Sequence, residues 1–522
     1  MKNKDSRIKS GFCKKLEGDL GFQYIEAFCH AVEVYVSSLE AFNPKVFEYH
    51  GAYLRYAVER YLYFYFLKNV RLYSCFREWV NSSRTTFINK TLAGVERNLA
   101  LCLCGIKLTP ENAAIRFRHR MNFNSFAFYL RFLMWKWAYS PFAHLFRIDG
   151  PKRNTGVDIL IYVPAEKFIR YLSKITEALP FSFSYFVDNS NSTIASFLIN
   201  QKLPFIDSSK LKFKIERNNL NTLPKELAEF RGLFLWYDCL HGALSLLRPR
   251  CVVIAEGNGP GDELINQACK QLSIPVICLQ HGWAPIVHNG FRNMTYTKML
   301  TWGQGFSELL QPYNFKQNFT AVGSHIIEQE SAGVDKNASF APKAISFFIQ
   351  VPSRLINEEC WNEFFKLIVW TAAEFEHVAV LVREFPVSPL PRKLRKELER
   401  YPNVKFMSRR LYSLSEVLKQ SQLAISIISS AILESIAAGV LPIIFNMTTM
   451  PRFFPDIEAS GAGLEVKSPQ AARDAISRCL TDKNYRNQFE PGMKSFQEKY
   501  FYKNDGKAVE RITQEIVSIV KA

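Results

Sequence analysis

The amino-acid sequence predicts an α/β protein in which two Rossmann-like domains face a cleft and a helical region precedes them. Three observations support this fold class. Short apolar strands alternate with helices in residues 151–327, the alternation returns in residues 342–500, and a polar stretch separates the two. Continuous apolar strands that alternate with helices are typical of parallel sheets covered on both faces.

The helical region spans residues 1–150. It shows helical periodicity and many aromatic side chains, as in Tyr53–Phe66 and Phe126–Trp137. It contains 22 Lys and Arg against 12 Asp and Glu, so +10 of the formal charge of +18 falls here. Two interpretations stay open: a helical domain that packs its aromatic side chains on the rest of the protein, or a surface helix at an anionic membrane.

The N-terminal Rossmann-like domain is expected at residues 151–327, on the acceptor side. Its helices are predicted over Glu166–Leu179 and Glu263–Leu272. Its predicted strands are Asp158–Val163, Phe183–Val187, Cys251–Ala255, Pro275–Leu279 and Lys298–Trp302.

The polar stretch Glu328–Ala341 is predicted to be a linker, followed by a C-terminal Rossmann-like domain at residues 342–500. A helix is predicted over Glu358–Glu374, and a helical tail over Pro469–Lys521 whose last part, residues 501–522, forms a C-terminal helix. The predicted strands are Ala344–Val351, His377–Val382, Val404–Met407, Leu423–Ile428 and Leu441–Phe445.

Composition excludes several classes of protein. The eleven cysteines show no paired metal spacing, so we expect buried, reduced thiols and no bound metal. Neither a zinc-finger spacing nor an RNP-like motif accompanies the basic charge, so nucleic acid is not an expected partner. Met1–Lys15 lacks the apolar segment of a secretory signal, and the most apolar candidate for a membrane span, Tyr61–Leu67, is short. We therefore expect a cytoplasmic protein, with peripheral attachment to the inner face of the membrane as a further hypothesis.

The most informative motif lies where an apolar strand ends in Ser429 and Ser430. Ligands of parallel sheets bind beyond the carboxyl ends of the strands, and hydroxyls with free backbone N–H groups suit a phosphate. Glu434 follows one turn later, where it could reach a ribose diol, and Gly439 and Pro442 lead into the next strand. The alternative is an ordinary serine helix cap followed by a solvated acid.

This unit resembles the donor-binding segment of GT-B glycosyltransferases, particularly those of bacterial capsule and lipopolysaccharide synthesis that carry a Ser-Ser motif. The resemblance covers about residues 155–500 as architecture, but only short segments as motif. It implies that Ser429 and Ser430 bind the donor phosphate and that Glu434 binds the ribose.

Two further segments match the donor side of the same enzymes. Arg383-Glu-Phe-Pro386 stands where several of them, including users of CMP-sugars, have Arg-x-His-Pro; Arg383 keeps a charge suited to phosphate, whereas Phe385 replaces the histidine. The turn with Arg409 and Leu411 stands where their backbone meets the nucleotide base, although its arginines could equally be solvated.

Candidate acid–base residues follow strands of the N-terminal domain. His281, in Gln-His-Gly, resembles a segment of polyol-phosphate and surface-carbohydrate transferases and is predicted to be a catalytic base. Glu256 and Asp262 in the turn Glu256–Glu263 are alternative bases, although Asp262 could simply cap a helix. His325 is predicted to contact the donor phosphate, with a tight hinge turn as the alternative.

Together these features predict a metal-independent glycosyltransferase that needs no cofactor. It would move a sugar from a nucleotide-sugar donor, with CMP-sugars favoured slightly over UDP-sugars, to a surface-glycan, lipopolysaccharide or lipid-linked glycan acceptor. Two alternatives stay open: a nucleotide-sugar 2-epimerase of the same fold, and a non-catalytic protein that binds a nucleotide or glycan.

Overall fold

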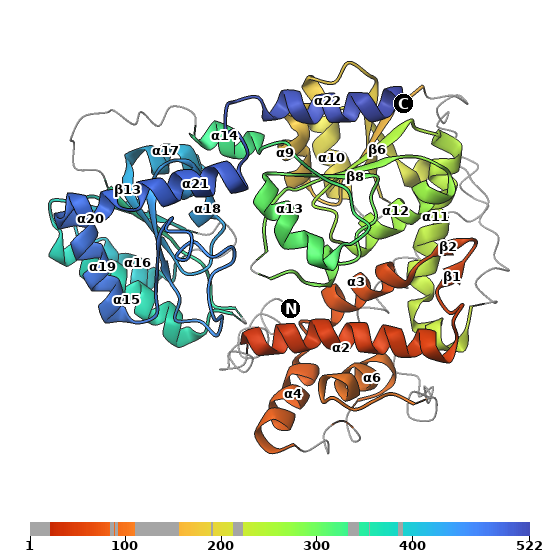
Figure 1. The fold of residues 1–522 in the computed structure, drawn as a ribbon, viewed down its shortest axis with the longest axis horizontal. Helices are drawn as coiled ribbons and strands as arrows, with labels where there is room; N and C mark the ends of the chain where they lie inside the picture. Colours follow the sequence, from red (N-terminus) through yellow and green to blue (C-terminus); the bar gives the residue numbers. More distant parts are fainter. Residues whose placement is uncertain are drawn as a thin grey trace, which may run out of the picture.

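The computed structural model describes residues 21–83, 88, 92–109, 156–188, 192–211, 223–284, 286–331, 344–353, 355–384 and 390–522. Within these residues the chain forms a helical N-terminal region and two α/β domains, each built on one parallel sheet (Figure 1). The predicted fold class is confirmed.

The helical N-terminal region packs against one face of the first α/β domain. Its helices are α2 (Gly21–Phe42), α3 (Arg55–Phe66), α4 (Val70–Ser82) and α6 (Gly94–Leu103), with a short hairpin of β1 (Glu48–Tyr49) and β2 (Ala52–Tyr53). One continuous apolar core joins Phe28 and Tyr35 of α2 to Leu160 and Val252 of the sheet. The aromatic side chains of these described helices therefore pack mainly on the protein itself. Phe126–Trp137 lies outside the described residues.

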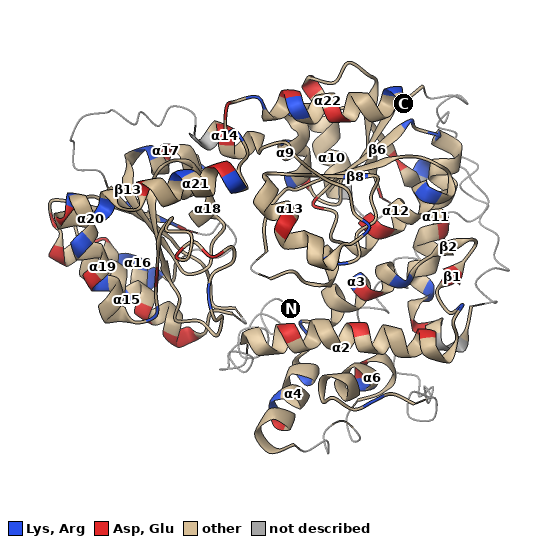
Figure 2. Ribbon diagram, viewed as in Figure 1, with Lys and Arg blue, Asp and Glu red and all other residues tan. Residues whose placement is uncertain are grey.

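Charge in this region is balanced where the structure describes it. Residues 21–83, 88 and 92–109 contain 8 Lys and Arg against 7 Asp and Glu, and Figure 2 shows both signs on its helices. The predicted basic excess of residues 1–150 therefore falls on segments outside the described residues. No helix of the described chain has the length and hydropathy that crossing a bilayer requires.

The first α/β domain is a parallel sheet of seven strands in the order β5-β4-β3-β6-β7-β8-β9. These strands are β3 (Ile159–Tyr162), β4 (Phe183–Val187), β5 (Phe205–Asp207), β6 (Cys251–Ala255), β7 (Val276–Leu279), β8 (Lys298–Thr301) and β9 (Phe319–Ala321). Its helices are α9 (Glu166–Glu177), α10 (Ser192–Asn200), α11 (Arg231–Leu247), α12 (Pro260–Gln271), α13 (Gln304–Leu310) and α14 (His325–Ser331). Side chains alternate between two buried cores along the inner strands β3, β6 and β7, which is why these strands are apolar.

The second α/β domain is a parallel sheet of six strands in the order β12-β11-β10-β13-β14-β15. These strands are β10 (Ala344–Phe348), β11 (Val380–Arg383), β12 (Val404–Phe406), β13 (Ser421–Ser426), β14 (Leu441–Phe445) and β15 (Leu464–Val466). Its helices are α15 (Glu358–Glu374), α16 (Arg392–Leu398), α17 (Leu414–Gln420), α18 (Ala431–Ala437), α19 (Pro469–Thr481), α20 (Lys483–Asn487) and α21 (Glu490–Tyr500).

The last helix, α22 (Ala508–Lys521), returns to the first domain (Figure 1). Ile512, Ile516 and Val520 lie on one helical stripe and belong to that domain's core. The Ala508 amide donates to Glu328 Oε2 at 2.9 Å. The C-terminal helix therefore completes the N-terminal domain.

Three details differ from the sequence analysis. The predicted linker begins too early, because its first residues, Glu328–Ser331, belong to α14 and Glu328 pairs with Arg511. Helix α12 begins at Pro260, not Glu263, because Asp262 bonds back to the Gly259 amide and so caps the helix earlier. The predicted helical tail is divided into four helices, α19 to α22, and the C-terminal helix expected over residues 501–522 begins only at Ala508. The ten cysteines among the described residues are free and buried, as predicted.

Candidate functional site

The carboxyl edges of the two sheets face one another. Trp283 lies in the loop after β7 and Phe454 in the loop after β14. The Trp283 indole donates to the Phe454 carbonyl at 3.0 Å, and the two ring centroids lie 5.7 Å apart. Parallel sheets bind ligands at their carboxyl edges. Each domain therefore carries its candidate binding region on the edge that faces the other domain.

In the C-terminal domain, the first strand β10 lies beside the fourth strand β13, which makes this the switch point of the strand order. Gln350 follows β10 and bridges the two strands. Its Oε1 accepts hydrogen bonds from the Ile428 amide at 2.8 Å and from Ser426 Oγ at 3.4 Å. The segment Ser429–Ser430 therefore starts at the switch point, and Gln350 holds the residue before it. Gln350 was not among the predicted site residues, because the predicted strand Ala344–Val351 includes it, whereas β10 ends at Phe348.

The two serines differ in what their hydroxyls contact. Ser429 Oγ accepts from the Ala431 amide at 3.3 Å. Ser430 stands at the N-cap of α18 but has a helical backbone and no side-chain cap bond, and it is exposed. Within the described residues its hydroxyl has no hydrogen-bond partner. Glu434 lies in the first turn of α18 and is half-buried.

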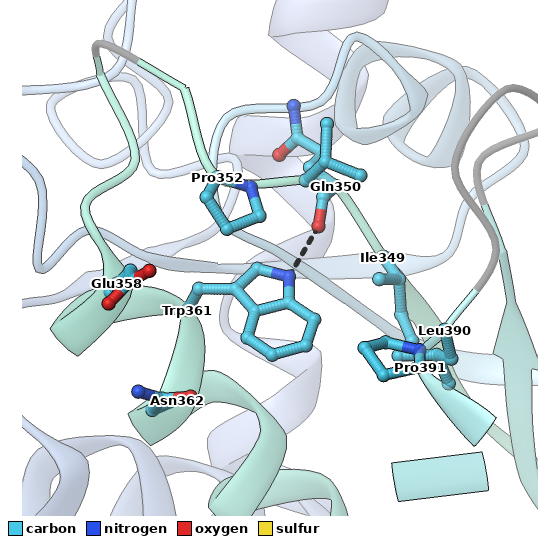
Figure 3. Close-up of a pocket in the computed structure, with 9 residues that line it drawn as sticks. Ile349, Gln350, Pro352, Glu358, Trp361, Asn362, Leu390 and Pro391 are labelled. Carbon is cyan, nitrogen blue, oxygen red and sulfur yellow. Dashed lines mark hydrogen bonds between the residues drawn. The ribbon is translucent and has the colours of Figure 1, made fainter. Parts of the chain in front are cut away.

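A pocket of about 210 Å³ opens beside Gln350 at the carboxyl end of β10. The Trp361 indole donates to the Gln350 carbonyl at 2.7 Å, and Figure 3 shows its ring beside Pro352, with Leu390 and Pro391 nearby. Its lining residues are Ile349, Gln350, Val351, Pro352, Glu358, Trp361, Asn362, Leu390 and Pro391. The pocket is thus mainly apolar, and its Gln350 wall is continuous with the Ser429–Ser430 segment.

Arg383 ends β11 and is buried. Its Nη1 donates to the carbonyls of Tyr412 and Ser413 at 3.0 and 3.2 Å. These bonds fix the turn that carries Arg409 and Leu411, both exposed, with Leu411 75% exposed. The structure therefore joins Arg383 to the predicted base-binding turn, while its contact with a phosphate stays a prediction. Phe385 and Pro386 lie outside the described residues.

The N-terminal sheet has its own switch point, between β3 and β6. An ion pair spans it: Lys167 Nζ, in the first turn of α9, lies 3.2 Å from Glu256 Oε2, directly after β6. Glu256 has a left-handed backbone with φ of 73° and donates its amide to the Leu279 carbonyl at 2.7 Å. Sequence analysis missed Lys167, whose place near the start of the helix after the first strand was the available signal.

His281 lies next to this ion pair. Its ring makes edge contacts with Phe168 and Tyr171, with centroids 4.9 and 4.8 Å apart. Burial, with the nearby positive charge of Lys167, lowers the pKa of His281 to about 4. The imidazole is therefore neutral near pH 7 and able to accept a proton. Gln280 fixes the preceding turn, because its Oε1 accepts from the Trp302 amide at 2.9 Å.

His325 also lies against Tyr171, the residue that His281 contacts. Its Nε2 bonds to the Tyr171 carbonyl at 2.7 Å, so Nε2 carries the hydrogen. The imidazole is 2% exposed, and burial lowers its pKa to about 4. Both histidines contact the ring of Tyr171, so the structure groups His325 with His281; its predicted phosphate contact stays a prediction.

Asp262 is buried at the start of α12. Its Oδ2 accepts from the Gly259 amide at 2.8 Å, and burial raises its pKa to about 7. The cap of this helix is Gly259. Asp262 thus shapes the turn after Glu256, and of the three predicted acid–base residues only Glu256 and His281 are partly exposed to solvent.

The described residues contain no group of His, Cys, Asp and Glu arranged to hold a metal ion. The site consists of hydroxyls, amides, two histidines and one Lys–Glu pair on opposed sheet edges. Such groups can bind a phosphorylated, polar ligand and move a proton.

No family model matches the sequence, and no curated protein matches it. Solved structures with a similar chain arrangement include the UDP-GlcNAc 2-epimerase from Neisseria meningitidis bound to UDP-GlcNAc (TM-score 0.47, 11% identity, 70% of this chain and 99% of that chain). MurG from Acinetobacter baumannii has a TM-score of 0.41 and 12% identity over 69% of this chain and 99% of its own. The wall teichoic acid polymerase TagF has a TM-score of 0.45 and 12% identity over 77% of this chain and 99% of its own. These likenesses assign no family to the chain.

Proposed function

We propose that the protein is a glycosyltransferase that moves a sugar from a nucleotide-sugar donor to a glycan acceptor. One observation carries the proposal: the Ser429–Ser430 segment and the Lys167–Glu256 pair lie at the switch points of two sheets whose carboxyl edges face each other. A group transfer needs two substrates held against one another, and this arrangement supplies one binding region for each.

On the donor side, the proposal assigns the phosphate to the Ser429–Ser430 segment. Its support is the exposed Ser430 hydroxyl, which has no hydrogen-bond partner among the described residues and follows a segment that Gln350 holds through the Ile428 amide. Glu434 is assigned to the ribose, and the turn with Arg409 and Leu411 to the base. Arg383 contributes by fixing that turn.

On the acceptor side, His281 removes the proton of the attacking hydroxyl. Its support is its place directly after β7, partly exposed and beside the Lys167–Glu256 pair. Glu256 is the alternative base, and its ion pair with Lys167 would have to open for that role.

The resemblance of the Ser-Ser unit favours a CMP-sugar slightly over a UDP-sugar, and a surface-glycan, lipopolysaccharide or lipid-linked glycan as acceptor. We extend the proposal to a cytoplasmic protein that works at the inner face of an anionic membrane through residues 1–150. The support for membrane attachment is the basic excess of this region in the sequence.

The test is a thermal-shift panel of CMP, UDP, GDP and their sugar conjugates on the full-length protein, with and without EDTA. One nucleotide is expected to raise the melting temperature with no effect of EDTA, and Ser430→Ala is expected to lose that shift. Ser495→Ala, which changes another exposed serine in α21, is the matched control and should keep it. A protein that no nucleotide stabilises contradicts the proposal.

The reaction is tested next with the stabilising donor. Release of the nucleotide should depend on an added glycan acceptor and fall strongly in His281→Ala. Interconversion of the donor sugar without any acceptor would instead indicate an epimerase.

A further inference from the structure

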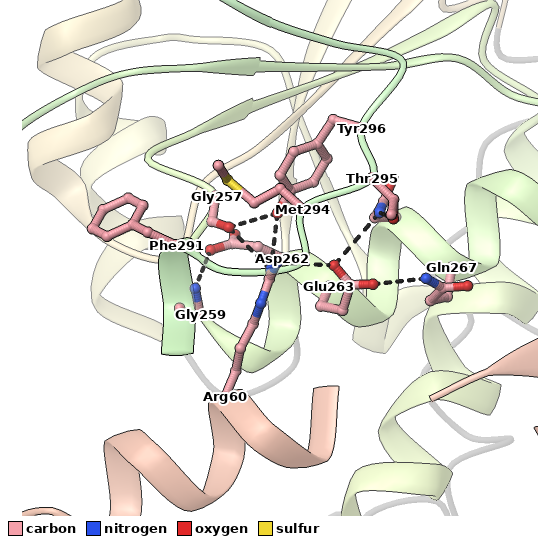
Figure 4. Close-up of polar contacts among 12 residues, drawn as sticks. Arg60, Gly257, Gly259, Asp262, Glu263, Gln267, Phe291, Met294, Thr295 and Tyr296 are labelled. Carbon is pink, nitrogen blue, oxygen red and sulfur yellow. Dashed lines mark hydrogen bonds and ion pairs between the residues drawn. The ribbon is translucent and has the colours of Figure 1, made fainter. Parts of the chain in front are cut away.

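Arg60 of α3 is a charged side chain with no exposed surface, inserted from the N-terminal helical region into the first α/β domain. Its Nη1 donates to the Gly257 carbonyl and to Tyr296 Oη, both at 3.0 Å. Its Nη2 lies 3.2 Å from Glu263 Oε2. Figure 4 shows the guanidinium entering the loop from below, between Asp262, Glu263 and Tyr296. Burying a charge this deeply is costly unless it is paired, and here the charge is paired with Glu263 of α12, while one hydrogen bond reaches the loop between β6 and α12.

That loop is residues 256–259, which carries Glu256 at the switch point. Tyr296 also donates to the Gly257 carbonyl, at 2.6 Å, and burial holds the pKa of Tyr296 well above its usual range, so the phenol keeps its hydrogen. The carbonyl of Gly257 is thus held by two donors. The backbone that leads to this carbonyl is left-handed at two consecutive residues, with φ of 73° at Glu256 and 65° at Gly257.

A left-handed glutamate is an uncommon conformation that persists only where surrounding contacts impose it. The contacts that impose it here are Arg60 and Tyr296 on the Gly257 carbonyl, and the bond from the Glu256 amide to Leu279. The Asn258 carbonyl in turn packs closely on Gly290, where a side chain would collide with it. The position of the Glu256 carboxylate therefore depends on a side chain from a helix outside the α/β domain.

We propose that Arg60 is a positioning residue: through the Gly257 carbonyl it sets the place of Glu256, which makes the N-terminal helical region part of the acceptor side of the site. The structural half of this inference, that Arg60 holds the loop of residues 256–259, stands on its own. The functional half, that this position matters for catalysis, rests on the proposed transferase activity.

The structural half is tested by hydrogen–deuterium exchange of the full-length protein. Arg60→Lys keeps the charge but loses the fork that reaches two acceptors, so exchange of the amides of residues 256–259 should rise about tenfold, with the β13–α18 segment unchanged. The control is Arg55→Lys, in the same helix and also ion-paired, whose guanidinium bonds to Glu59 and Ser37 instead. Unchanged exchange in Arg60→Lys, or an equal rise in Arg55→Lys, overturns the proposal.

The functional half is tested by kinetics with the donor found above. Arg60→Lys should lower kcat about tenfold or more with donor affinity unchanged, because the donor binds the other domain. A merely structural role would lower the melting temperature and leave kcat per folded molecule the same, which overturns this half. Arg60→Met/Glu263→Gln, which removes both buried charges together, provides a second folded variant if Arg60→Lys is unstable, and it should show the same fall in kcat. If the wild type uses no donor, the proposed function fails, while the exchange result still decides whether Arg60 holds the loop.

Discussion

Replacing Gly257 by alanine should lower the free energy of unfolding for two reasons: strain in the left-handed backbone and a steric clash of the new Cβ. At φ of 65° any other residue pays for the backbone conformation, about 1–2 kcal/mol. A Cβ at this position would also overlap with Cys278 Sγ and lie 3.1 Å from the Tyr296 ring. Both neighbours are buried, so they cannot move away freely, and overpacking of this kind adds about 1–3 kcal/mol. We expect Gly257→Ala to lower the free energy of unfolding by about 2–5 kcal/mol.

The control is Gly105→Ala. Gly105 has a similar φ of 69°, but a Cβ there would meet nothing within 4 Å, so only the backbone cost applies. Urea unfolding followed by tryptophan fluorescence gives both values, and the difference between them should be about 1–3 kcal/mol. Adding Cys278→Ala should recover part of the loss in Gly257→Ala, as a double-mutant cycle measures. Equal losses at Gly257 and Gly105 would refute the reasoning from the close contact.

Three further predictions concern stability. Ser430→Ala should change the free energy of unfolding by less than about 0.5 kcal/mol, because Ser430 makes no cap bond. Ser468→Ala removes the cap of α19 and should lower the free energy of unfolding by about 1 kcal/mol. Equal losses in thermal unfolding would contradict this prediction. Ile512→Ala leaves a void in the first domain's core and should cost about 2–5 kcal/mol in urea unfolding, and a loss under 1 kcal/mol would show that α22 is not docked. The pKa of His325 is about 4 in the folded protein and about 6.5 unfolded, so as the pH falls from 6.5 to 4 only the unfolded chain takes up the proton and stability declines. His325→Asn should make that decline shallower, and an unchanged slope would contradict the lowered pKa.

The inner strands could be predicted from sequence because they are mostly apolar and buried. β4, β6 and β14 have the predicted bounds, as does helix α15. The sequence analysis did not predict the edge strands β5, β9 and β15. Each has three residues, and β5 and β9 are only half-buried, so neither length nor hydrophobic periodicity distinguishes them from loops.

The candidate site was predictable in part, for a physical reason. Segments such as Ser429–Ser430 and Gln280–His281 directly follow apolar strands, so the rule on carboxyl edges finds them. Lys167, Gln350 and Arg60 act through contacts with residues 89, 78 and 197 positions away, and only the folded chain brings those partners together. Nothing in the local sequence distinguishes Arg60 from Arg55, five residues earlier in the same helix.

The return of α22 to the first domain has a consequence for synthesis in the cell. The last strand of that domain's sheet ends at Ala321, but the stripe of Ile512, Ile516 and Val520 that covers part of one face is made about 200 residues later. At about 5–20 residues per second, the ribosome needs roughly 10–40 s to make the intervening chain of about 200 residues. During that interval the part of the apolar face that α22 covers is open to water, which exposes the nascent chain to aggregation until α22 docks.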